Sequence, residues 1–259
     1  MTIWQAVLLG IIQGLTEFLP VSSSGHLVIG QYFLGLKEPE LLFDTGVHFA
    51  TVIAVVIYFR KDIIKLLTSL IGKDQNTERR TAYAIIIGTI PAVFVGLFFK
   101  DFLESFFSSP QMASYMLILT GVLLFTSFYA KPQGKKLWGI KWLDALIIGI
   151  AQAISIMPGI SRSGATITTA LHLGFENEDA ARFSFLLSLP AIFGAGILQA
   201  IGLSAITTQE LIPLVFGMFS AGITGYFAIA FMLKLVGRGK LYAFSPYCII
   251  VGLIVLIIL

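Results

Sequence analysis

Two short polar stretches hold most of the side chains that could do chemistry in an otherwise apolar sequence. The first, from residue 13 to 26, reads QGLTEFLPVSSSGH, and the second, from 152 to 166, reads QAISIMPGISRSGAT. A polar group among apolar neighbours is costly unless it is hydrogen-bonded. The polar side chains of each stretch must therefore satisfy one another or bind a ligand. They include Gln13, Glu17, Ser22, Ser23, Ser24 and His26 in the first stretch, and Ser161, Arg162, Ser163 and Thr166 in the second.

Glu17 and Arg162 are the charged side chains of these stretches. Gln13 and Glu17 lie four residues apart, so on a helix they share one face. An arginine at membrane depth needs an anionic partner, and its planar fork of donors suits phosphate oxygens. Two interpretations stay open here: Glu17 and Arg162 pair with each other, or an anionic ligand replaces that pair.

Serine and glycine residues stand immediately before a short helical segment in both stretches. Such residues are ordinary helix N-caps. The same geometry also forms an anion site, because free N–H groups and the positive end of the helix point at the ligand. His26 is equally suited to proton transfer, to nucleophilic attack on phosphorus, or to a hydrogen-bonding role in the core. The capping or anion-binding residues are Ser22, Ser23, Ser24 and Gly25 in the first stretch and Ser161, Ser163 and Gly164 in the second.

The composition places these stretches in a membrane protein. The sequence has 259 residues, of which 57% are hydrophobic and 12% charged, and its mean hydropathy is +0.91. These values lie outside the range of soluble proteins and indicate a polytopic membrane protein. The single cysteine, Cys248, excludes an intrachain disulfide. A net charge of +3 without a basic aromatic patch gives no indication of nucleic-acid binding.

Each polar stretch interrupts a pair of apolar segments. Segment 2–19 is followed by the serine run and by segment 27–36, which is too short to cross a bilayer. The order recurs with 143–157, a polar break at 158–163 and the short segment 165–173. Polar backbone at membrane depth is tolerated only when buried in protein or lining a wet cavity, so each pair predicts a re-entrant helical hairpin. The predicted membrane-spanning segments are 42–59, 83–99, 112–130, 183–201, 211–235 and 244–259, joined by connections at 36–40, 60–80, 100–110, 131–141 and 174–182.

The recurrence is an internal repeat. Seven residues match seven others at one constant offset: Gly10, Ile11, Gln13, Ser22, Ser24, Gly25 and Gly35 match Gly149, Ile150, Gln152, Ser161, Ser163, Gly164 and Gly174. Each half then has one hairpin and three spans, and an odd number of spans inverts the second half. We therefore expect an all-α integral membrane bundle of two inverted-topology repeats, about 1–135 and about 141–259, within a single domain 1–259. Proteins with this layout place their site where the repeats meet.

Basic residues set the expected orientation. Connections 60–80 and 131–141 and the loop with Arg238 and Lys240 fall on one side of this topology. Because cytoplasmic loops are enriched in lysine and arginine, that side is expected to be cytoplasmic. Both termini are then outside, and the first hairpin enters from the outer face, to which the site would open.

Other polar residues carry weaker indications. Asp44 and His48 lie four residues apart at the head of a predicted span, where they either support the site or lie at the membrane interface. His172 is expected at the interface, and the acidic residues at 176–179 are expected in a solvated turn. The sequence contains no P-loop, CxxC pair, HExxH motif or dinucleotide fingerprint.

The two stretches resemble the signature motifs of the undecaprenyl-diphosphate phosphatases, the integral-membrane family of the bacitracin-resistance type. The first family motif separates a Glu or Gln from a Glu by three residues, a pattern met by Gln13 and Glu17. This sequence departs from the members that carry Glu at the position of Gln13. The second family motif, PG-x-SRS-x-x-T, is met by Pro158, Gly159, Ser161, Arg162, Ser163 and Thr166. The resemblance extends along the chain through IPA at 90–92 and FSFLLSLPA at 183–191.

The resemblance implies hydrolysis of undecaprenyl diphosphate to undecaprenyl phosphate in the bacterial plasma membrane, recycling the lipid carrier for cell-wall polymers. It also implies dependence on a divalent cation such as Mg²⁺ or Ca²⁺. Arg162 and helix-end amides would then stabilise developing negative charge, and Glu17, with Gln13, would position a metal ion or a proton. Ser23, His26 and water stay open as the nucleophile, and a homo-oligomer also stays open. The residues expected to bind the substrate are Gln13, Ser22, Ser24, Gly25, Ser161, Ser163, Gly164 and Thr166.

A transporter or flippase is the alternative function, because inverted repeats with broken helices are typical of transporters. Such a protein would bind the phosphorylated polyprenyl lipid without cleaving it, or would both transport and cleave it. Phosphate release by the purified protein separates these two functions.

Overall fold

The structure is a computed structural model that describes residues 1–36, 41–71, 77–99, 102–103, 106, 109–201 and 208–259. Regular structure within these residues is helical, apart from one isolated β-bridge between Lys135 and Phe175. The predicted all-α fold class is therefore confirmed. Residues 37–40 and parts of the predicted connections 60–80 and 100–110 lie outside the described residues.

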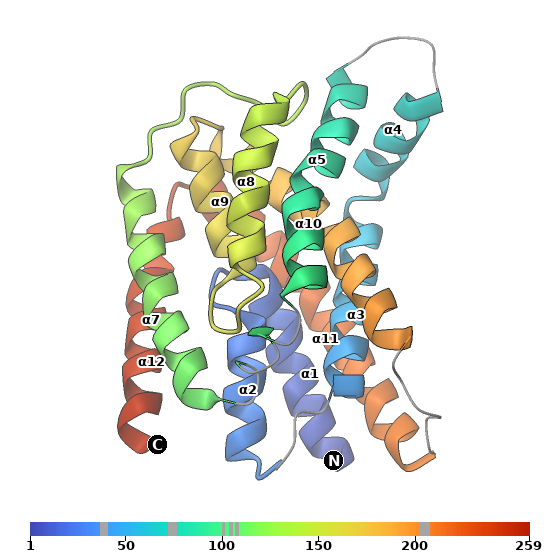
Figure 1. The fold of residues 1–259 in the computed structure, drawn as a ribbon, viewed down its shortest axis with the longest axis vertical. Coiled ribbons are helices and arrows are strands. Elements are labelled where there is room, and N and C mark those ends of the chain that lie inside the picture. The colour runs from blue at the N-terminus through green and yellow to red at the C-terminus, as the bar shows by residue number, and fades with distance from the viewer. Residues whose placement is uncertain (37–40, 72–76, 100–101, 104–105, 107–108, 202–207) are drawn as a thin grey trace.

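Helices form a bundle whose long axes run along one common direction (Figure 1). In the first half they are α1 (Ile3–Phe18), α2 (Ser23–Phe33), α3 (Leu41–Tyr58), α4 (Arg60–Ile71), α5 (Thr77–Phe98), α7 (Pro110–Thr126) and the 3-10 turn η1 (Ser127–Tyr129). In the second half they are α8 (Trp142–Ile154), α9 (Arg162–His172), α10 (Asn177–Ile201), α11 (Thr208–Gly237), the 3-10 turn η2 (Leu241–Phe244) and α12 (Ser245–Ile258).

The bundle is that of a multi-pass membrane protein. Among the described residues, five helical stretches are long and apolar enough to cross a bilayer, and a sixth passes if α3 and α4 form one bent span. Helices α1 and α8 are apolar but shorter, as expected for the first arms of re-entrant hairpins. The five stretches are Thr77–Phe98, Pro110–Tyr129, Asn177–Ile197, Glu210–Gly237 and Leu241–Ile258.

Helix α4 differs from the predicted basic connection. It turns by 80° from α3 and packs against α5. Asp62, Leu66 and Ser69, which recur at helical spacing, form its buried face. Arg182 of α10 donates to Asp62 Oδ2 at 2.7 Å, so tertiary contacts hold a helix where the sequence suggested only a charged loop.

The helix α10 begins earlier than predicted. It starts at Asn177 rather than at 183, so Glu178 and Asp179 lie in its first turn. The acidic residues thus begin a helix rather than form a separate turn, while Glu178 is exposed, as the prediction of a solvated segment requires. Carboxylates favour the N-terminal turn because they face the positive end of the helix dipole.

The two hairpins meet inside the bundle from opposite ends. Helices α1 and α2 occupy its lower half in Figure 1 and α8 and α9 its upper half, with their breaks near mid-height. Both termini lie at the lower end, and α4 and the α7–α8 connection lie at the upper end. The ring of Tyr242 in η2 packs edge-on against Phe128 in η1 at 5.2 Å, so the third basic connection adjoins the second.

Glycine contacts bring the first arm of each hairpin against a spanning helix. A Cβ atom on Gly10 of α1 would collide with the backbone of Gly217 in α11, and one on Gly149 of α8 would collide with the backbone of Gly88 in α5. Small residues allow such close approach of two membrane helices. The two contacts fix the positions of α1 and α8 in the bundle, and therefore how far the C-terminal ends of these helices reach into it.

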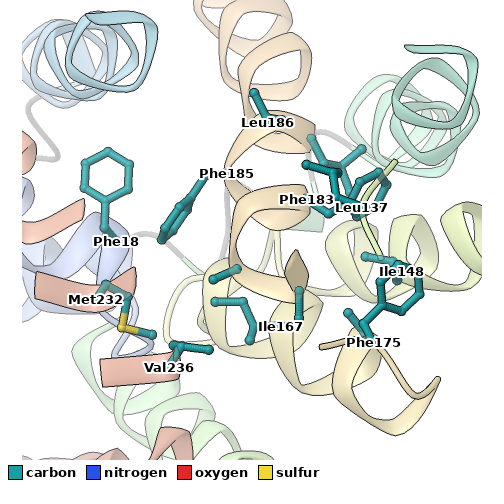
Figure 2. Packing of buried hydrophobic residues seen from close by; sticks show 14 of the residues in the cluster. Phe18, Leu137, Ile148, Ile167, Phe175, Phe183, Phe185, Leu186, Met232 and Val236 are labelled. Carbon is teal, nitrogen blue, oxygen red and sulfur yellow. The ribbon is translucent and has the colours of Figure 1, made fainter. Parts of the chain in front are cut away.

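A large apolar cluster surrounds the junction of the hairpins (Figure 2). Phe18 at the end of α1 packs edge-on against Phe185 of α10, with ring centroids 5.5 Å apart. Met232 and Val236 of α11 and Ile167 of α9 belong to the same cluster. Because Phe18 is anchored in this cluster, the preceding residue, Glu17, is held at a fixed depth.

Candidate active site

The break between α1 and α2 is built around Ser22. Its backbone lies at φ 66° and ψ 97°, and it is the one non-glycine residue at positive φ in the described part of the chain. That conformation costs of order 1–3 kcal/mol and recurs at functional sites. Ser22 Oγ accepts from Gly25 N at 3.3 Å, and its carbonyl accepts from the backbone N–H of His26 at 3.1 Å. These contacts cap α2 and compensate for part of the strain.

The break between α8 and α9 is capped in the same way. Ser161 Oγ accepts from Gly164 N at 3.0 Å. The loop is also fixed from outside by Thr120 of α7, whose hydroxyl donates to Gly159 O at 2.8 Å and accepts from Ser161 N at 3.0 Å. Thr120 was not predicted as a site residue, since within an apolar span it resembles any other threonine.

Three contacts join the two breaks. Gly159 N donates to Ser22 Oγ at 3.1 Å, and Ser163 Oγ donates to Leu19 O at 3.1 Å. The third contact is an ion pair between Arg162 Nη2 and Glu17 Oε1. The structure thus brings together the two polar stretches that are far apart in the sequence.

Glu17 is the centre of this junction, with only 5% of its side chain exposed. While Arg162 contacts Oε1, the second oxygen, Oε2, accepts from Ser23 Oγ at 2.5 Å and from Gln13 Nε2 at 3.0 Å. His48 Nε2 of α3 lies 3.6 Å from the same oxygen. Side chains from α1, α2, α3 and α9 therefore converge on one carboxylate.

Of the two interpretations of Asp44 and His48, the structure favours support of the site. His48 faces Glu17, and its Nδ1 lies 2.7 Å from Asp44 O. A carbonyl oxygen only accepts, so Nδ1 carries the proton in this contact. Asp44 Oδ1 in turn accepts from Gln31 Nε2 at 2.7 Å, which links α3 to α2.

His26 faces a different partner. Its Nδ1 lies 2.8 Å from Ser22 O, and its Nε2 lies 2.9 Å from the hydroxyl of Tyr247 in α12. The two rings are nearly parallel, at 4°, with centroids 5.8 Å apart. Tyr247 was not predicted, because a tyrosine near the end of an apolar span is ordinary in membrane proteins.

The remaining predicted residues occupy the margins of the junction. Ser24 Oγ lies 3.4 Å from Ser22 Oγ, and the hydroxyl of Thr166 contacts Arg162 O at 2.8 Å and Ser184 Oγ at 2.6 Å. His172 Nε2 contacts Thr126 Oγ1 at 3.1 Å, at the far end of α9.

The sequence model of the family described as Bacitracin resistance protein BacA matches residues 6–254. The chain belongs to this family. The resemblance seen in the two motifs is thereby confirmed.

Similar proteins cover nearly the whole chain. A protein of Desulforapulum autotrophicum named undecaprenyl-diphosphatase is 44% identical over 99% of this chain and 98% of its own. Proteins of the same name from Halothermothrix orenii and Carboxydothermus hydrogenoformans are 41% and 44% identical, each over 100% of this chain and 98% of their own.

Unpaired polar atoms lie in α1, α8 and α9 of this BacA-family chain. Arg162 Nη1, Gln13 Oε1 and both side-chain polar atoms of Gln152 are buried without a hydrogen-bond partner in the described structure. A buried donor or acceptor left unsatisfied costs about 1–3 kcal/mol. Arg162 and Gln13 both also contact Glu17. Arg162 Nη1 and Gln13 Oε1 are therefore available to a ligand that reaches the ion pair.

The donor set does not form a resident site for the divalent cation that the family resemblance implies. No group of three or more His, Cys, Asp or Glu side chains able to hold a metal occurs within the described residues. Both oxygens of Glu17 already accept from donors, and one of them faces the Arg162 cation. Mg²⁺ and Ca²⁺ need six or more oxygen ligands, which substrate and water would have to supply here. Glu17 as a metal ligand therefore stays a prediction.

Replacing Thr120 by valine tests how the second break is held. The variant keeps the side-chain volume but leaves Gly159 O and Ser161 N without their partner, at a cost of about 1–3 kcal/mol for each unsatisfied group. We expect a thermal midpoint several degrees lower for the purified protein. Thr89→Val is the matched control, because that hydroxyl donates only to Ile85 O within its own helix. Equal midpoints for the two variants would contradict this role of Thr120.

Proposed function

We propose that this chain hydrolyses undecaprenyl diphosphate to undecaprenyl phosphate and phosphate, and so recycles the lipid carrier for cell-wall polymer synthesis. The observation that carries this proposal is identity of 41–45% over nearly the full length to proteins named undecaprenyl-diphosphatase. The buried Glu17–Arg162 pair supports it, because a diphosphate can replace the carboxylate as partner of the guanidinium. The polyprenyl tail would stay among the apolar helices of the bundle.

Arg162 is assigned to binding and charge stabilisation. Its Nη1 has no partner in the described structure, and Arg162 is the first residue of α9, where helix N–H groups favour an anion. Donors fixed in a water-poor site before the reaction stabilise negative charge that develops on phosphate oxygens. The N-terminus of α2, which starts at Ser23, is directed to the same junction.

Ser23 is assigned as the nucleophile, with Glu17 as its base. The hydroxyl of Ser23 donates to Glu17 Oε2 at 2.5 Å, the arrangement in which a carboxylate activates a serine. Ser23 Oγ would attack the terminal phosphorus, its proton would pass to Glu17, and undecaprenyl phosphate would leave. Water would then hydrolyse the phosphoserine and release phosphate. His26 Nε2 faces Tyr247 instead of Glu17, so His26 would accept the proton of that water once the water takes the place of the phenol at Nε2.

The two halves are proposed to be inverted repeats. Ser22 and Ser161, which match at the repeat offset, each accept from the glycine three residues ahead. Gly10 and Gly149, which also match, each contact the backbone of a spanning helix. Equivalent residues therefore make equivalent contacts, as inverted repeats require.

The basic end of the bundle is proposed to be cytoplasmic. Lysine- and arginine-rich segments lie at the end opposite the termini, in α4, in the α7–α8 connection and at the turn before η2 (Figure 1), and basic loops stay on the cytoplasmic side. The termini and the lower end of the first hairpin would then be outside, and the site would open to the outer face.

Phosphate release from undecaprenyl diphosphate by the purified chain tests the function. The Arg162→Ala variant is expected to lower kcat/KM by about 10²–10³, as for removal of a donor to developing charge. For Glu17→Gln, which removes the base, the expected loss is about 10²–10⁴. Lys61→Ala, on the exposed side of α4, is the control and should match the parent. Lipid binding without phosphate release by the parent would favour the transporter alternative.

Trapping of a phosphorylated enzyme tests the assignment of Ser23. After rapid quenching during turnover, mass spectrometry of the digested protein should place a phosphoryl group on Ser23, and Glu17→Gln should slow its formation. Ser69→Ala, which removes a hydroxyl that donates only to Leu66 O, should leave the phosphoryl group in place. Phosphate found on His26, or full turnover by Ser23→Ala, would exclude this mechanism.

Cysteine labelling in intact cells tests the orientation. Cys248 is buried, so Cys248→Ala gives a background in which single exposed cysteines can be placed. Gln111→Cys at the start of α7 and Lys136→Cys in the basic connection are both exposed positions. A membrane-impermeant maleimide should label the first in intact cells and the second only after the membrane is opened. The reverse pattern would place the termini in the cytoplasm.

A further inference from the structure

His26 has a partner that the proposed reaction does not use. The Tyr247 hydroxyl lies 2.9 Å from His26 Nε2, although the residues are 221 positions apart in the sequence. Tyr247 belongs to α12, and its side chain is 44% exposed, so it lies between the junction of the hairpins and the outside of the bundle. Because the two segments are distant in the sequence, the contact depends on how α2 and α12 pack together.

The second ring nitrogen determines what this contact does. His26 Nδ1 lies 2.8 Å from Ser22 O, and a carbonyl oxygen only accepts. In the neutral ring Nδ1 then carries the proton, and Nε2 presents a lone pair. The phenol must therefore donate to Nε2, because it is the one partner of that atom in the described structure. The two contacts fix both the tautomer and the plane of the imidazole.

We propose that Tyr247 is a positioning residue for His26, holding the imidazole with Nε2 unprotonated until the water that releases phosphate takes the place of the phenol and gives its proton to Nε2. This inference rests on the proposed function for its catalytic consequence, but not for the contact itself. A partner that sets the tautomer and orientation of a histidine is a recurrent device in enzyme sites. The strained backbone of Ser22, which supplies the carbonyl on the other side of the ring, belongs to the same arrangement.

Tyr247→Phe keeps the aromatic ring and removes only the donor. We expect kcat to fall on the order of tenfold, less than the 10²–10⁴ contributed by a general base itself, with KM unchanged. In a His26→Ala background Tyr247→Phe should have no further effect, since positioning needs a residue to position. Tyr83→Phe, an exposed tyrosine of α5, is the matched control and should behave like the parent.

A spectroscopic measurement tests the contact without turnover. The chain has three histidines, so ¹⁵N-histidine NMR of the substrate-free protein can be assigned with His26→Ala. The parent should show an unprotonated Nε2 for His26, and Tyr247→Phe should shift that signal. Tyr247→Leu, which also removes ring stacking, provides a second variant if Tyr247→Phe is poorly folded.

The experiments distinguish the positioning role of Tyr247 from the proposed phosphatase function. An unchanged His26 signal in Tyr247→Phe, or an equal loss of kcat from Tyr247→Phe with and without His26, would overturn the positioning role. A parent protein that releases no phosphate would instead overturn the proposed function, while the NMR measurement would still decide whether Tyr247 holds His26.

Discussion

One buried carboxylate sets the constraint that the rest of the structure meets. Glu17 is almost fully removed from solvent, and a buried ionised group is stable only when it is paired and hydrogen-bonded. Its partners come from four helices, three of which belong to the two opposed hairpins. A buried ion pair rarely adds net stability over a well-packed apolar pair. The presence of the Glu17–Arg162 pair is better explained by the proposed binding of an anionic ligand, which would replace Glu17 as the partner of Arg162.

The hairpin breaks follow from a second constraint, which concerns the backbone. Helices that end at membrane depth leave N–H and C=O groups that no water can satisfy. Serine caps, the Thr120 hydroxyl and the contacts between the breaks supply these partners. The same groups that satisfy the breaks also concentrate donors around Glu17. The residues that satisfy the helix ends are therefore the same residues that build the proposed anion site.

Local sequence signals predicted the hairpins and the polar residues of their breaks, because charged residues and helix caps can be recognised within a single segment of the sequence. Thr120 and Tyr247 were not predicted, since each acts on a residue far away in the chain. Thr120 stands among apolar residues in the sequence, as does Thr89, whose hydroxyl donates only to a carbonyl of its own helix. Helix α4 was read as a basic connection because the face that it buries becomes recognisable only once α5 packs on it.

Environment, more than spacing, separates the roles of Ser23 and His26. The two residues lie three apart at the start of α2, so the sequence places them on neighbouring faces of one helix. In the bundle, Ser23 reaches the carboxylate of Glu17 whereas His26 lies between a carbonyl and a phenol. A hydroxyl needs a nearby base to become nucleophilic, while a neutral imidazole with a fixed tautomer is itself a base. The same helix start can thus serve attack on phosphorus through one residue and removal of a proton from water through the other.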